Sequence, residues 1–151
     1  MRSIAALLAV LAIGCTDDKD PYEPPDCSTV KGTDTFVVGL AKAGDAGALD
    51  FALMSIAPSP AMRGDNTWIV AIADTNGQPF DGASLTVTPF MPAEQHQHNS
   101  PIRVEVMPVA GVPGQYTLAP VNLWMPGIWE TTIRASSGDT TDSAVYTFCI
   151  N

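Results

Sequence analysis

Soft metal-ligand side chains gather in one short stretch of the sequence. Residues 91–98 read Met-Pro-Ala-Glu-Gln-His-Gln-His and contain both histidines of the chain, with a methionine at the start. Thioether sulfur and neutral imidazole suit copper better than the hard ions magnesium and calcium. His96 and His98 are two positions apart, so in an extended segment both side chains point to the same side and one ion could bind both. The stretch is a candidate copper site with Met91, His96 and His98 as ligands.

The same residues also fit a purely structural role. Polar residues surround both histidines, which is typical of a solvated loop. Methionines commonly fill gaps in hydrophobic cores, and Met91 precedes a proline where a sandwich would need its end covered. The sequence leaves the metal site and the solvated loop as open alternatives.

No catalytic arrangement accompanies the histidines. The Gly82-Ala83-Ser84-Leu85 segment lacks the closing glycine of a nucleophile elbow. A blue-copper centre needs a free cysteine beside two histidines, and Cys149 is followed only by Ile150 and Asn151. We therefore expect neither an enzyme nor an electron-transfer copper protein.

Short β-rich runs separated by turn residues surround this stretch. Their regular spacing, without an amphipathic helix, predicts an all-β fold, an Ig-like antiparallel β-sandwich of about 7–8 strands. The run at 84–88, Ser-Leu-Thr-Val-Thr, alternates apolar and polar residues as a half-buried strand does. The expected strands are 35–40, 49–57, 68–73, 84–88, 103–109, 115–123, 128–136 and 144–150.

Antiparallel connections alternate between the two ends of such a sandwich. We call the end with the 91–98 connection the histidine end. Counting strands places the 58–65 connection, with Met62, and the 124–127 turn, with Trp124 and Met125, at this same end. Met62 and Met125 thereby become further candidate copper ligands, and Trp124 becomes a candidate contact residue for a partner.

The beginning of the chain reads as a lipoprotein leader. A basic Arg2 precedes the uncharged apolar run 4–13, which is too short to span a bilayer, and Gly14 stands directly before Cys15. This order resembles the bacterial lipobox, whose cysteine is acylated and becomes the new N-terminus. We expect residues 1–14 to be a cleaved signal peptide and Cys15 to carry the lipid; a soluble secreted protein cut nearby is the alternative.

The organisation that follows is a tether and one domain. Residues 15–26 are rich in proline and aspartate and read as a flexible tether, and residues 27–151 form the sandwich. We expect the protein in the bacterial cell envelope, held by its lipid on the outer membrane and facing the periplasm.

The cysteine count predicts a disulfide. With Cys15 assigned to lipid, Cys27 and Cys149 remain, and the strand count places both at the histidine end, so an exported protein should join them in a disulfide. The alternative, two thiolate metal ligands, lacks other ligands at suitable spacing.

Loss of Arg2 with the leader leaves six of the seven basic residues against 16 acidic ones, a formal charge of −10. That charge excludes nucleic acid as a partner, and membrane attachment must come from the lipid.

Several segments resemble the YtkA-like domain family over roughly residues 49–135. The resemblance is carried by 74–79, Gly82-Ala83, 87–98, 114–116 and the Trp-Met-Pro-Gly-Ile-Trp run at 124–129. That family is a small exported Ig-like domain, similar in style to FixH-type accessory proteins and often carried on bacterial lipoproteins. Its members commonly read Met-Pro followed closely by His-x-His, whereas Ala93, Glu94 and Gln95 separate the two parts here. The resemblance implies the sandwich fold and copper handling or assembly of envelope components.

Two functions follow as hypotheses. The first is a lipid-anchored envelope module that binds copper through the methionine and histidine residues of the histidine end. The second is a non-catalytic structural or protein-interaction domain of the cell envelope that binds no metal, with Trp124 in contact with another envelope protein.

Overall fold

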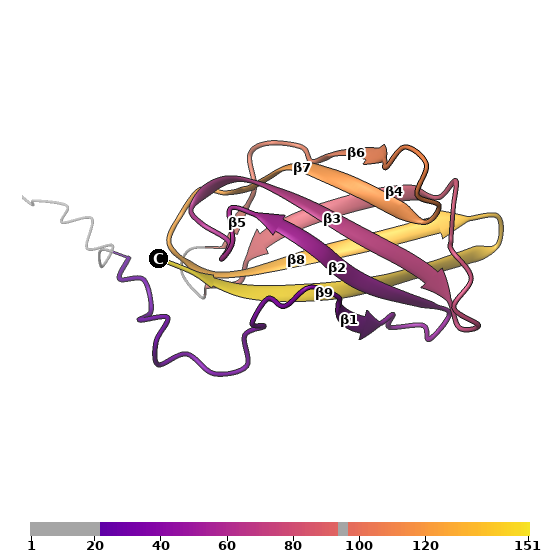
Figure 1. Cartoon of the computed structure of the whole chain (residues 1–151). Coiled ribbons are helices and arrows are strands. Elements are labelled where there is room, and N and C mark those ends of the chain that lie inside the picture. Colours follow the sequence, from indigo (N-terminus) through magenta and orange to yellow (C-terminus); the bar gives the residue numbers. More distant parts are fainter. Residues whose placement is uncertain (1–21, 94–96) are drawn as a thin grey trace, which may run out of the picture.

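The fold is an antiparallel β-sandwich, confirming the sequence prediction (Figure 1). The computed structural model describes residues 22–93 and 97–151. Sheet A has the order β1-β2-β3-β7-β6 and sheet B the order β5-β4-β8-β9. The strands are β1 Leu40–Ala43, β2 Leu49–Ala57, β3 Gly64–Asp74, β4 Ser84–Met91, β5 His98–Asn99, β6 Glu105–Pro108, β7 Gln115–Leu123, β8 Gly127–Ser137 and β9 Thr140–Ile150.

Within these described ranges the structure contains no helix long and apolar enough to cross a membrane. All of the strand pairs within the two sheets are antiparallel. Strands that follow one another within a sheet therefore reverse direction, as the pairs β1–β2, β2–β3, β4–β5, β6–β7 and β8–β9 show.

The structure differs from the sequence prediction at one expected strand and at one strand that was not expected. The strand expected at 35–40 is wrong: the chain turns at Gly39, whose φ is 82°, and β1 begins only at Leu40. Before that turn, the Asp34 backbone N–H donates to the Thr147 carbonyl, and the Asp34 carboxylate accepts from the Thr147 N–H, both at 2.7 Å. This segment thus contacts the open edge of β9 instead of sheet A. The short strand β5 was not expected from the sequence.

The core lies between the sheets and consists of the inward side chains of both. β9 shows the alternation most clearly, because Ala144, Tyr146, Phe148 and Ile150 are buried while the residues between them are not. Trp68 of β3 meets Phe148 edge to face, with ring centroids 5.5 Å apart. Each large apolar side chain buried in this way contributes about 1.5–3 kcal/mol relative to exposure.

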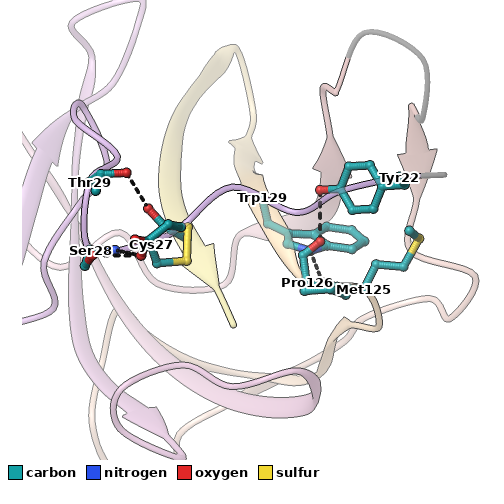
Figure 2. Close-up of a disulfide and its surroundings, with 9 residues drawn as sticks. Tyr22, Cys27, Ser28, Thr29, Met125, Pro126 and Trp129 are labelled. Carbon is teal, nitrogen blue, oxygen red and sulfur yellow. Dashed lines mark hydrogen bonds between the residues drawn. A yellow bond between two sulfur atoms is a disulfide. The ribbon is translucent and has the colours of Figure 1, made fainter. Parts of the chain in front are cut away.

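A disulfide joins Cys27 to Cys149, confirming the predicted pair (Figure 2). Their Cα atoms are 5.5 Å apart across a sequence separation of 122 residues. In the chain-entropy estimate, closing a loop of this order is worth about 4.7 kcal/mol. The bond fixes the segment that precedes the sandwich to the final strand.

Asp142, near the start of β9, anchors the loop before β2 at the end of the strand opposite to Cys149. Its carboxylate accepts hydrogen bonds from the backbone N–H groups of Ala46, Ala48, Leu49 and Ser143 at 2.8–3.0 Å. Burial by itself raises the pKa of this carboxyl, but the four N–H donors lower it by more, so the net pKa lies below its usual value of 3.8. The charged form therefore stabilises the folded state.

We predict that Asp142→Asn lowers the free energy of unfolding by about 2 kcal/mol at pH 7, because the variant loses charge-assisted hydrogen bonds. Since the folded pKa is depressed, this contribution is fully present above about pH 5 and is lost as the pH falls through the folded pKa. Urea unfolding at pH 7 and pH 3 should show the gap between wild type and variant shrinking in acid. Asp139→Asn, which removes the same charge from an exposed turn, is the control. A gap that stays constant with pH would contradict this role.

Candidate metal site

The structure brings the connections of the histidine end together (Figure 1). Gly64, directly after the Met62 loop, pairs with Leu123, directly before Trp124. The β7–β8 turn then leads to Gly127, which pairs with Ile150 at the end of β9. The Met62 loop, the Trp124–Pro126 turn and the disulfide therefore share one end of the sandwich, as the strand count predicted.

His98 lies between a buried methionine and an exposed indole. In the β4–β5 pair, His98 is directly opposite Met91, and residues in this relation point to the same face. Met91 is fully buried. The His98 and Trp124 rings pack edge to face, with centroids 5.2 Å apart and an interplanar angle of 66°, and Trp124 is 40% exposed. The short β5 strand thus positions the imidazole against the β7–β8 turn.

Two hydrogen bonds fix the backbone of that turn. The Trp129 indole N–H donates to the Met125 carbonyl at 2.9 Å, and the Tyr22 hydroxyl donates to the Pro126 carbonyl at 3.0 Å. Figure 2 shows Tyr22 and Trp129 with the Met125 and Pro126 carbonyls of the turn. Met125 is partly buried and packs against the core. The thioether of Met125 is therefore held on the segment that also presents Trp124.

Gly127 lets three segments close on one point. Its φ is 133°, and a Cβ at this position would collide with the Tyr22 hydroxyl oxygen and lie only 3.0 Å from Met91 Cε. The terminal methyl of Met91 and the hydroxyl of Tyr22 therefore both lie against the Gly127 backbone. Sequence reasoning missed Tyr22, because its proline-rich surroundings favour a tether, and no local signal pairs it with Gly127.

Met62 lies at the same end but is largely exposed, with 57% of its surface accessible. The Asn66 side chain, itself 1% exposed, accepts from the Met62 N–H at 3.0 Å and donates to the Met62 carbonyl at 2.8 Å. This amide fixes the backbone of the loop. The Met62 side chain is thus presented to solvent from a well-supported backbone.

Two of the predicted site residues, Cys15 and His96, lie outside the described residues. In the described part of the chain, no three histidine, cysteine, aspartate or glutamate side chains group in a way that could hold a metal ion. Among the described residues, a set of metal ligands at the histidine end would therefore include thioethers. The ligand set Met62, Met91, His96, His98 and Met125 stays a prediction. Within this set, Met91, His98 and Met125 lie on segments that the structure shows to be adjacent.

The fold and this end define the class of protein: a small disulfide-closed Ig-like β-sandwich whose loops carry methionine, histidine and tryptophan at one end. The chain belongs to the YtkA-like family, whose model matches residues 45–134, more than half of the sequence.

The fold is similar to the crystal structure of PcoC, a methionine-rich copper resistance protein from Escherichia coli, at 20% sequence identity and a TM-score of 0.42; the match covers 66% of this chain and 96% of PcoC. No curated protein sequence matches the chain.

We predict that Gly127→Ala destabilises the protein by roughly 1–3 kcal/mol, because the added methyl meets Tyr22 and Met91 in a fully packed region. Gly111→Ala is the matched control, since Gly111 also has a positive φ but a Cβ there meets nothing within 4 Å. The excess loss for Gly127→Ala in urea unfolding measures the collision. Adding Tyr22→Ala should recover part of that excess, and strictly additive losses would contradict the proposed contact.

Proposed function

We propose that this protein is a lipid-anchored module of the bacterial cell envelope that binds copper at the histidine end. The observation that carries the proposal is the position of His98, which lies opposite Met91 and against Trp124, the residue before Met125. An imidazole and two thioethers thereby belong to adjoining segments, and this mixture of ligands favours copper. Met62 and His96 are the additional candidate donors.

The individual ligands differ in access. Met91 is fully buried, so an ion bound by its sulfur must reach the edge of the core, whereas Met62 is open to solvent. The Trp124 ring borders His98 and could stabilise a bound cation through its electron-rich face. The acidic charge of the whole chain also favours the approach of cations.

Lipid attachment is the second part of the proposal. It is supported by the basic start, the apolar run and Gly14 before Cys15. Cleavage before Cys15 would leave the sandwich attached by acyl chains, on the outer membrane facing the periplasm. The lipid, and no basic patch, would then hold this acidic protein at the bilayer.

A non-catalytic interaction domain is the second candidate function. Its supporting observation is that Trp124 and Met62 expose large apolar surfaces at the same end. Tryptophan and methionine are enriched at the contact surfaces of proteins. In this alternative the histidine end binds another envelope protein and needs no metal.

Copper titration separates the two candidates. We predict that residues 15–151 with Cys15→Ser bind Cu(I) more tightly than micromolar under anaerobic competition with a chelator. His98→Ala should weaken binding at least tenfold, about 1.4 kcal/mol, because one of few ligands is lost.

Met107→Leu is the matched control, since Met107 is an exposed methionine on β6, where it pairs with Thr117. Binding weaker than micromolar, or equal affinity in His98→Ala and Met107→Leu, would rule out the copper site. A partner protein that co-purifies with the metal-free protein and is lost in Trp124→Ala would then support the interaction domain.

A further inference from the structure

The N-terminal segment leaves the sandwich at the histidine end. Tyr22 packs against the core and donates its hydroxyl to the Pro126 carbonyl at 3.0 Å. Five residues later, Cys27 is bonded to Cys149 of β9, close to the same end. Two independent attachments therefore determine where the chain departs towards its N-terminus (Figure 2).

The chain length before Tyr22 limits how far this end can lie from a lipid on Cys15. Seven residue steps separate Cys15 from Tyr22 in the sequence. Even fully extended, seven steps span at most about 25 Å. The 11 residues of β9 extend the sandwich by roughly 36 Å in the other direction. The histidine end is thus the end next to the anchoring bilayer.

The surface at this end has the composition of a membrane-contacting surface. Trp124 is 40% exposed and Met62 is 57% exposed, and both lie on connections of the histidine end. Tryptophan is enriched at the level of lipid headgroups, where its ring and its N–H both find suitable surroundings. Arg63, which follows Met62, adds an exposed cation that can contact lipid phosphate.

The overall charge selects the kind of lipid. After cleavage before Cys15 the chain has 16 acidic against six basic residues, so a strongly anionic membrane surface would repel it. Zwitterionic headgroups, such as phosphatidylethanolamine, carry no net charge and allow close approach. The partner that fits this surface is a neutral lipid headgroup layer.

We propose that the histidine end rests on the headgroup layer of the membrane that anchors the protein. Trp124 and Met62 are the contact residues, and Tyr22 attaches the N-terminal segment so that this end faces the membrane. The inference rests on the proposed lipid anchor at Cys15 and is independent of copper. It places the candidate copper site at the membrane surface, where the site would face membrane-embedded partners and not the bulk periplasm.

Tryptophan fluorescence tests this orientation directly. Trp68 and Trp129 are fully buried, so a headgroup quencher reports on Trp124. The full lipidated protein is placed in vesicles of phosphatidylethanolamine and phosphatidylcholine that contain a nitroxide-headgroup phosphatidylcholine. We expect the nitroxide lipid to quench the wild-type emission and Trp124→Phe to lose at least half of that quenching.

The role of Tyr22 in setting this orientation is tested with two variants. Tyr22→Ala should reduce the quenching at least twofold, because the ring contact and the hydrogen bond are both lost. Tyr22→Phe keeps the ring and should lie between Tyr22→Ala and the wild type. Quenching that is equal in Tyr22→Ala and the wild type would show that Tyr22 does not set the orientation.

Vesicle flotation separates the failure of the anchor from the failure of the orientation. Protein that does not float with vesicles would overturn both the lipid anchor and this inference. Protein that floats with equal, weak quenching in wild type and Trp124→Phe would overturn the inference alone. Copper affinity measured on the lipid-free chain is unaffected by either outcome.

Discussion

The Cys27–Cys149 disulfide is the constraint on which the arrangement of the histidine end depends. It joins the segment before the first strand to the last strand, and it holds Tyr22 within reach of the turn between β7 and β8. Tyr22 and Met91 then meet at the Gly127 backbone, which only a residue without a side chain allows. The covalent bond and this close contact together fix the turn that presents Trp124 and Met125.

Much of the fold could be predicted because its signals are local. The strands β2 and β7 have the predicted bounds, since their apolar residues are flanked by turn-forming glycine and proline. The cysteine pair could be predicted because assigning Cys15 to lipid leaves only Cys27 and Cys149 to pair in an exported chain. The strand expected at 35–40 was wrong because its β-branched residues carry a strand signal, whereas Gly39 turns the chain and Asp34 bonds to β9. β5 was missed because its two residues form a strand only through pairing with β4.

The candidate site was predictable to the level of loops but not of contacts. Strand counting placed the Met62 and Trp124 connections beside the histidine stretch, which the structure bears out. It could not show that Met91 is buried, that His98 meets the Trp124 ring, or that Tyr22 covers the Gly127 turn. These features depend on side-chain packing between segments far apart in the sequence. They also show that one end of the sandwich combines structural and solvent-facing methionines.

X-ray absorption at the copper edge tests the central claim, a mixed thioether and imidazole site, most directly. The protein is loaded with one equivalent of Cu(I) and its first coordination shell is resolved into sulfur and nitrogen neighbours. The account predicts sulfur and imidazole nitrogen in the same shell, because Met and His side chains share the histidine end. A shell of nitrogen and oxygen alone, with no sulfur neighbour, would contradict it.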